Sequence, residues 1–272
     1  MTRRDFVTTA IGAGGAWLAA PATAGATVST VPQGSPAREF YELRRYTLRR
    51  GPMTSLVESY LEKAFIPACR RAGTGPVGVF NVTIGPDSPS TYVLIPHASA
   101  DGCVELAERL RTDREHLEAG REYLDVAATS PAFVRIESSL LRAFAGMPRL
   151  ELPFGGGEAG RRSRLFELRT YESHSEKAGQ KKIEMFDTGE IALFRKAGML
   201  PVFFGETIVG PRMPSLTYML VYEDMEMRDR VWRTFATMPE WRELSSTPGF
   251  TDPEIVTSIT NVYLRPAAFS EI

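Results

Sequence analysis

The chain has 272 residues, of which 43% are hydrophobic and 24% charged, and its formal net charge is −1. This length accommodates one large or two small domains with a substantial buried core. Because no basic excess exists to attract phosphate backbones or anionic lipid, nucleic-acid binding is not expected.

The N-terminus predicts a signal peptide over residues 1–24. Arg3 and Arg4 precede a weakly hydrophobic stretch, which is followed by Pro21 and by the small residues at 22–24 (ATA). This order of charged segment, apolar segment and small-residue cleavage site is typical of secretory signals, and the paired arginines indicate the twin-arginine (Tat) route. The alternative is an apolar N-terminal helix that stays on the protein.

Cleavage after Ala24 or after Ala26 would release a periplasmic or secreted protein. The apolar stretch is too short to span a bilayer, and no other apolar run approaches that length, so no stable membrane insertion is expected after cleavage. Residues 25–37 predict a flexible leader. Cys69 and Cys103 could form a disulfide after export, but a Tat substrate folds first in the reducing cytoplasm, which favours two separate thiols.

An internal repeat organises the rest of the chain. Residues 41–46 (YELRRY) recur 125 positions later as residues 166–171 (FELRTY). The same offset relates residues 71–73 (RAG) to residues 196–198 (KAG). Several anchors at one spacing indicate a gene duplication, and therefore two copies of one structural unit.

Each copy has the pattern of four strands and two helices. The hydrophobic periodicity of the first copy predicts strands at residues 40–48, 77–84, 91–95 and 133–142, and helices at 56–73 and 101–111. The second copy predicts strands at residues 164–172, 202–209, 216–222 and 255–264, and helices at 181–197 and 228–237. Pro67 lacks an N–H and should kink its helix, whereas its counterpart Ala192 should not.

The order βαββαβ is that of the ferredoxin-like split unit, which predicts an α+β fold. The modules are expected at residues 38–145 and 164–266, with an exposed Gly-rich linker at residues 146–163. A four-stranded sheet with helices on one face leaves its other face bare. We therefore expect the two tandem modules to pack their bare faces together as a pseudo-two-fold α+β barrel.

The repeated segments 41–46 and 166–171 resemble those of the NIPSNAP family. The RAG and KAG helix ends, the Gly-Pro turns and residues 239–242 (PEWR) support this resemblance, which extends over both modules. It implies a dimeric α+β-barrel fold and brings no settled reaction. The first copy has residues 114–116 (REH) where the second has PEW, so the two halves need not share one role.

The repeated motif carries the candidate ligand-binding residues, which are Glu42, Arg44, Tyr46, Glu167, Arg169 and Tyr171. Side chains alternate along a strand, so each triplet shares one face. With Leu43 and Leu168 assigned to the helix-facing side, the triplets are expected to point into the barrel interior. There they could bind an anionic or carbonyl-bearing ligand, or act as acid and base. Alternatively, each Glu and Arg neutralise each other and fix the strand register.

No metal site and no cofactor are expected. His97, His116 and His174 lack metal-ligand spacing to one another or to a cysteine, and surface positions are the default for them. The sequence has no nucleotide-binding loop and no nucleophile elbow. Trp241 is expected to pack against its own helix rather than to form a lid over the barrel mouth.

The sequence thus favours an exported module that binds a small ligand or a protein partner inside its barrel, with homodimer formation left open. The alternative is an enzyme, a cofactor-independent monooxygenase that uses the interior Glu, Arg and Tyr groups, which rests on fold analogy alone. An enzyme predicts an open cavity around these groups. A binding or structural module predicts that they pair with one another in a filled barrel.

Overall fold

Two consecutive βαββαβ units follow one another in the computed structural model, which describes residues 37–154 and 164–272. The predicted signal peptide, nearly all of the predicted leader and the glycine-rich part of the predicted linker lie outside the described residues. The elements of the first unit are β1 (Phe40–Thr47), α1 (Pro52–Tyr60), α2 (Ile66–Arg71), β2 (Gly78–Ile84), β3 (Ser90–His97), α3 (Asp101–Thr112), α4 (Arg114–Ala119), α5 (Arg121–Leu124) and β4 (Arg135–Ala143).

The second unit repeats this order. Its elements are β5 (Leu165–Glu172), α6 (Glu176–Met185), α7 (Ile191–Lys196), β6 (Leu200–Val209), β7 (Ser215–Tyr222), α8 (Met225–Thr237), α9 (Pro239–Ser246), α10 (Asp252–Ile255) and β8 (Ser258–Pro266). The short helices α4, α5, α9 and α10 were not predicted, because four to eight residues are too few to establish a helical period.

The eight strands close into one barrel in the order β1-β3-β2-β8-β5-β7-β6-β4, and neighbouring strands are antiparallel. Each unit contributes four adjacent strands in the ferredoxin-like order. The edge strand β2 pairs with β8, and β4 pairs with β6, so each unit satisfies the open edges of the other. The predicted α+β barrel of two tandem ferredoxin-like modules is confirmed.

Apolar side chains from both units fill the barrel interior. Tyr41 of β1 packs on Phe203 of β6 with ring centroids 5.1 Å apart, and Phe80 of β2 packs on Phe166 of β5 at 4.8 Å. The same buried cluster includes Leu94, Leu141, Val202, Met219 and Leu264. An eight-stranded barrel is just wide enough for side chains to fill it, and this one is a packed core.

The predicted orientation of the Glu/Arg/Tyr triplets is wrong. Leu168 belongs to the interior cluster and Leu43 packs against it, whereas Tyr46 and Tyr171 belong to the clusters beneath the helices. Because alternate residues of a strand face opposite sides, the Glu and Arg of each triplet also lie between sheet and helices. The physical reason is that Leu43 and Leu168 pack with the apolar cluster inside the barrel, while the helices supply polar partners for the triplets.

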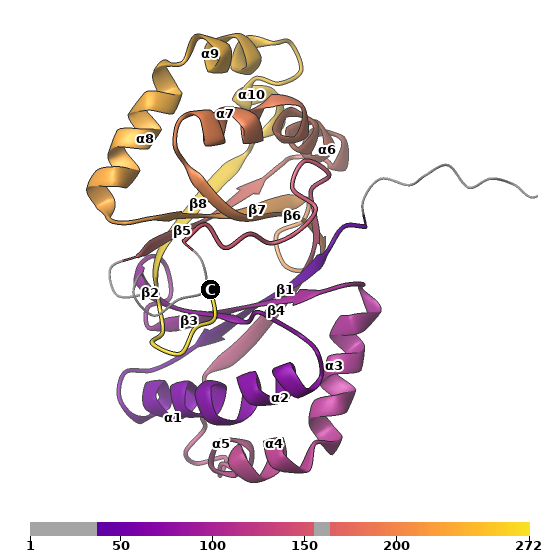
Figure 1. Ribbon diagram of the computed structural model, residues 1–272, viewed down its shortest axis with the longest axis vertical. Helices are drawn as coiled ribbons and strands as arrows, with labels where there is room; N and C mark the ends of the chain where they lie inside the picture. Colours follow the sequence, from indigo (N-terminus) through magenta and orange to yellow (C-terminus); the bar gives the residue numbers. More distant parts are fainter. Residues whose placement is uncertain (1–36, 155–163) are drawn as a thin grey trace, which may run out of the picture. The chain divides into compact units, whose positions relative to one another are not determined.

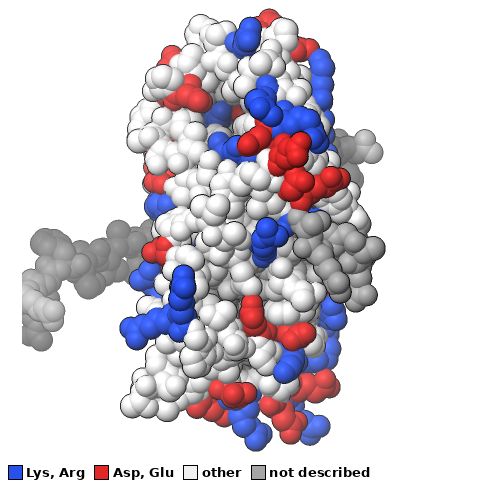
Figure 2. Space-filling model, turned by 90° about the vertical axis from the view of Figure 1, so that its left-hand side faces the viewer, with Lys and Arg blue, Asp and Glu red and all other residues white. Residues whose placement is uncertain are grey.

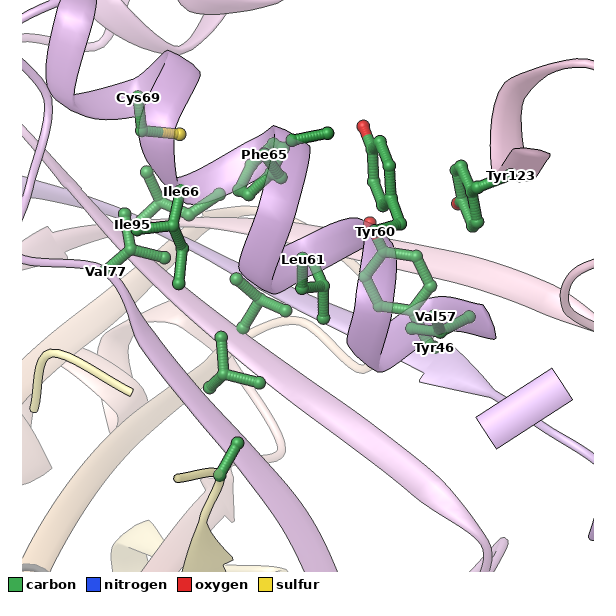
Figure 3. Packing of buried hydrophobic residues seen from close by; sticks show 14 of the residues in the cluster. Tyr46, Val57, Tyr60, Leu61, Phe65, Ile66, Cys69, Val77, Ile95 and Tyr123 are labelled. Carbon is green, nitrogen blue, oxygen red and sulfur yellow. The ribbon is translucent and has the colours of Figure 1, made fainter. Parts of the chain in front are cut away.

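Helices cover the outer side of each half of the barrel, α1–α5 over β1–β4 and α6–α10 over β5–β8 (Figure 1). In the first unit, Leu61 and Phe65 pack in one buried cluster with Ile95 of β3 (Figure 3). Tyr60 stacks on Tyr123 of α5 with ring centroids 3.8 Å apart, which ties the short helix to the long one. No helix among the described residues is long and apolar enough to cross a membrane.

A π-helical turn interrupts the long helix of each unit, at Leu61–Phe65 between α1 and α2 and at Phe186–Glu190 between α6 and α7. Both copies have this turn, although only the first has a proline, Pro67, in the helix that follows it. The predicted contrast between a distorted first helix and an undistorted second one is therefore not seen. Both helices end as predicted, at glycines with positive φ, 74° for Gly73 and 89° for Gly198. Glycine adopts this left-handed conformation without a Cβ clash.

Candidate functional site

In the second unit, the carboxylate of Glu167 is fully enclosed and hydrogen-bonded on all sides. Arg169 Nη1 donates to Oε1 at 2.9 Å and Arg228 Nη2 donates to the same oxygen at 3.1 Å. The Tyr222 hydroxyl and Trp232 Nε1 donate to Oε2 at 3.0 and 3.1 Å. Glu167 has no exposed surface, because side chains of α8 and β7 occupy the positions from which a ligand would contact its carboxylate.

The guanidinium of Arg169 is enclosed as well. Its Nη2 donates to the Tyr171 hydroxyl at 3.0 Å, which in turn is 3.0 Å from the hydroxyl of Tyr218. Its Cζ lies 4.5 Å from the centroid of the Trp232 ring, a cation–π distance. The predicted triplet of the second unit is therefore brought together, and its members bind one another.

A second buried ion pair lies beside this network. Lys182 Nζ of α6 donates to Glu190 at 3.0 Å, and both side chains are almost completely buried. Lys182 also lies 5.8 Å from the ring of Trp241, which contacts Phe235 of α8 at 4.4 Å. Trp241 thus packs against the preceding helix and, together with Leu244 of its own helix, against the buried cluster of Ala178, Met185 and Ile255. Sequence reasoning missed this pair because its residues lie in helices with no repeated motif.

In the first unit, fewer residues donate hydrogen bonds to the Glu42 carboxylate than to that of Glu167. Arg44 donates to both carboxylate oxygens, with Nη2 2.9 Å from Oε1 and 3.0 Å from Oε2, and its Nη1 is 3.4 Å from the Tyr46 hydroxyl. Ser138 of β4 donates to Oε1 at 2.6 Å. The remaining contact is Cys103 Sγ of α3, which is 3.6 Å from Oε2. Here too the predicted triplet is brought together and paired.

Both carboxylates have lowered pKa values. Burial raises the pKa of Glu42, but the charge of Arg44 and the hydrogen bonds from Ser138 and Arg44 lower it more. Burial likewise raises the pKa of Glu167, and the hydrogen bonds and charges of Arg228 and Arg169 outweigh it. At neutral pH both groups are therefore charged acceptors and not proton donors.

His174 is exposed, as expected, but the other two histidines are not. His97 and His116 are buried rather than on the surface, at 5% and 4% exposure. His116 Nδ1 donates to the Leu110 carbonyl at 2.9 Å, and its Nε2 shares a hydrogen bond of 3.0 Å with the Tyr60 hydroxyl. His116 is a satisfied core residue that joins α4 to the long helix.

His97 is different, because its Nε2 atom is buried with no hydrogen-bond partner among the described residues. Burial lowers the pKa of this imidazole, which is therefore neutral at pH 7. His97 ends β3, where its backbone pairs with Phe40, the first residue of β1. The strand pairing brings one of its ring nitrogens within 4.8 Å of ligand atoms of both Glu42 and Cys103.

A cleft of about 450 Å³ opens beside His97. It lies between the end of α2, the end of β3 and α3, and we name it the β3–α3 cleft. The residues that line it include Arg38, Glu39, Gly73, Thr74, His97, Ser99, Gly102, Glu105, Arg109 and Arg149. None of the six predicted ligand-binding residues is among them.

The charges around the β3–α3 cleft are unequally paired. Arg109 lies 3.8 Å from Glu105 and donates to the Ala72 carbonyl, and the carboxylate of Glu39 accepts from the Leu150 amide. Neither Arg38 nor Arg149 forms an ion pair with any residue that the structure describes. The cleft therefore presents two available guanidinium groups beside a neutral imidazole.

Sequence reasoning found the carboxylate and guanidinium of each motif but missed their partners. The one sequence signal for these partners is the 125-residue repeat offset, which aligns His97 with Tyr222 and Cys103 with Arg228. Glu42 and Glu167 are thus matched in the two copies, while the groups that meet them from the helix side are not.

Comparison with known proteins places this geometry in context. The profile of the NIPSNAP family matches residues 41–145 and 166–271. Two solved structures are similar over most of the chain: a candidate monooxygenase from Lactobacillus acidophilus (9% identity, TM-score 0.53, covering 84% of this chain and 94% of that one) and another from Fusobacterium nucleatum (9%, 0.53, 85% and 93%). At these identities the likeness shows the fold alone.

A third solved structure is similar to part of the chain. It is an uncharacterized NIPSNAP-like domain protein from Burkholderia xenovorans, 24% identical, with a TM-score of 0.36, covering 40% of this chain and 89% of that one. No curated protein matches the chain.

Proposed function

We propose that this chain, which belongs to the NIPSNAP family, is a binding protein. Its first unit binds a small anionic molecule in the β3–α3 cleft. The observation that carries this proposal is the cleft itself, with Arg38 and Arg149 at its wall. Its volume of about 450 Å³ lies within the range of small-molecule sites. Guanidinium groups recognise carboxylates and phosphates through paired, charge-assisted hydrogen bonds.

The second unit supports this division of roles. The Glu167 carboxylate accepts hydrogen bonds from Arg169, Arg228, Tyr222 and Trp232, which is the pattern expected of a structural lattice. The ligand site is proposed in the cleft and not inside the barrel, because aromatic and aliphatic side chains fill most of the interior and the pocket beside Arg45 and Glu137 has only about 70 Å³.

The enzyme alternative has less support. The candidate monooxygenases share the fold with this chain, but a fold hosts many functions. The Glu, Arg and Tyr groups that such chemistry would use are bound to one another in both units. Paired groups were the expectation for a binding or structural module.

Partners other than a small molecule have no specific observation in their favour. On the face that Figure 2 displays, basic and acidic side chains are interspersed, so that face offers no continuous basic surface for nucleic acid. A homodimer is not needed to close the barrel, because one chain supplies all eight strands.

The test uses calorimetric titration of the full-length protein with inorganic phosphate and with citrate. We expect saturable binding of one of these probes at a single site, weakened at least tenfold by Arg149→Ala. The matched control is Arg242→Ala, an exposed arginine of α9, which should leave the affinity unchanged. If neither probe binds, and native mass spectrometry finds no small molecule on freshly purified protein, the proposal fails.

Export is the second part of the proposal. It is supported by Arg3 and Arg4, by the apolar stretch after them and by the small residues at 22–24. The function proposed above would then be carried out in the periplasm or outside the cell, on a ligand present there. The two parts are independent, since cleft binding can be measured on purified protein.

A further inference from the structure

Three groups of chemistry that metals prefer meet at one point of the first unit. They come from three elements: Glu42 from β1, His97 from the end of β3, and Cys103 from the first turn of α3. One ligand atom of each lies within 4.8 Å of the other two. Glu42 and His97 are each only 5% exposed, and Cys103 is half-buried.

One of these groups has a polar atom without a partner. His97 Nε2 is buried and makes no hydrogen bond within the part of the chain that the structure describes. Leaving a buried polar atom unsatisfied forfeits its hydration without a compensating hydrogen bond, so native structures rarely do it without a reason. A ligand that binds imidazole nitrogen supplies such a reason.

In the second unit, a cationic side chain contacts the carboxylate that corresponds to Glu42. At the positions of His97 and Cys103 it has Tyr222 and Arg228, and both donate to the carboxylate of Glu167. The guanidinium of Arg228 is a permanent positive charge at this carboxylate. In the first unit the same two positions carry an imidazole and a thiol, which are ligands for a cation and not cations themselves.

We infer that Glu42, His97 and Cys103 bind one divalent transition-metal ion of the zinc class. Carboxylate oxygen, imidazole nitrogen and thiolate sulfur are the donors that zinc takes in proteins, and three protein ligands leave one position for water or a substrate. Zinc–ligand bonds of about 2.0–2.3 Å in a tetrahedron place the donor atoms about 3.3–3.8 Å from one another. The Cys103 Sγ to Glu42 Oε2 distance of 3.6 Å already lies in that range.

Metal binding at this site releases one proton. The Cys103 thiol loses its proton to solvent, and its sulfur forms a bond to the metal. Glu42 would bind through Oε2, the oxygen next to Cys103, which otherwise accepts only from Arg44 Nη2 among the described residues. Oε1 accepts from both Arg44 and Ser138, which would orient the ligand from the other side. His97 and Gly102 line the β3–α3 cleft, so an ion held here would be reached from it.

This inference goes beyond the proposed ligand binding and does not depend on it. The test is a titration of the full-length, tag-free protein, freed of metal with a chelator, first with Zn²⁺ by calorimetry and then with Co²⁺ by absorption. We expect one equivalent of each to bind. Cobalt should produce a thiolate-to-metal charge-transfer band, because a cysteine sulfur is among the ligands.

The variants separate this site from adventitious binding. Cys103→Ser should abolish the charge-transfer band, and His97→Ala should weaken Zn²⁺ binding at least tenfold. Cys69→Ala is the matched control, because it removes the other thiol and should keep the band. Circular dichroism checks that each variant is folded.

A band that survives Cys103→Ser, or that disappears in Cys69→Ala, would overturn the inference, and so would a wild-type protein that binds no cobalt. Phosphate or citrate binding that depends on Arg149 can succeed or fail without changing these readings. The two proposals can therefore fail separately.

Discussion

Arg228 holds both oxygens of Glu167, with Nη2 3.1 Å from Oε1 and Nε 3.4 Å from Oε2. These two hydrogen bonds link α8 to β5 across the space between helix and sheet. At the matching position of the first unit, 125 residues earlier, stands Cys103. One duplicated framework thus carries a closed charge network in one copy and an incompletely satisfied carboxylate beside a cleft in the other.

The buried network of the second unit should be a structural one. Arg169→Met is expected to lower the free energy of unfolding by about 3 kcal/mol, the low end for a broken buried pair, since Arg228 still holds Glu167. Adding Glu167→Gln should recover part of the loss, which urea denaturation of the double-mutant cycle measures. The control, Arg195→Met, breaks an exposed pair with Glu151 and should cost about 0–1 kcal/mol. Coupling near zero between the two substitutions would contradict a structural pair.

Acid should destabilise the fold through the same carboxylates. The folded-state pKa of Glu167 lies below its ordinary value of 4.5, so the unfolded chain binds more protons on acidification. The stabilisation is complete above about pH 4.5 and is lost as the pH falls through the folded-state pKa. Urea midpoints at a series of pH values should therefore drop below this point, and the drop should be smaller in Glu167→Gln. Glu62→Gln, at an exposed position, serves as control, and an equal drop in both variants would argue against this assignment.

The two units should unfold as one. Tyr41 and Phe203 meet across the barrel interior from different units, 5.1 Å apart. A cycle of Tyr41→Leu and Phe203→Leu should show a coupling of about 0.5–1.5 kcal/mol, and wild-type unfolding should have a single transition. Tyr41→Leu combined with Phe235→Leu, on the buried side of α8, should be additive. Two separated transitions would show that the units fold independently.

Cys69 should be unreactive in the native protein. The side chain is fully buried, and burial raises the pKa of its thiol to about 12, so the reactive thiolate is scarce. Thiol titration of Cys103→Ser should detect Cys69 only after denaturation. Unfolded wild-type protein, never exposed to reductant, should titrate two thiols, as the free cysteines in the structure indicate. Fewer than two would reveal a disulfide.

Export should depend on the paired arginines of the N-terminus. Changing Arg3 and Arg4 together to lysine should trap the full-length chain in the cytoplasm, because the Tat route reads the arginine pair. Cell fractionation and immunoblotting measure the distribution. The control is the same double change at Arg49 and Arg50, an adjacent pair beyond the signal, which should not affect export. Normal amounts of processed protein outside the cytoplasm in the Arg3 and Arg4 variant would refute the signal assignment.

The sequence alone determined the architecture of this protein. The 125-residue offset fixed the duplication, and the alternation of strand and helix periods fixed the βαββαβ order, because both are local properties of the chain. Glycines at 73 and 198 ended the helices because only a residue without Cβ takes positive φ there without strain.

Only the tertiary structure decided which way the polar motif faces and what it meets. Alternation shows that Glu42 and Arg44 share a face, but a sheet buried on both sides offers apolar neighbours to either face, so the pattern cannot tell interior from helix side. Leu43 packs inward against the apolar cluster that side chains from both units build inside the barrel. His97 and Cys103 reach Glu42 because strand pairing and helix packing join positions far apart in the chain, and no local spacing records such a contact.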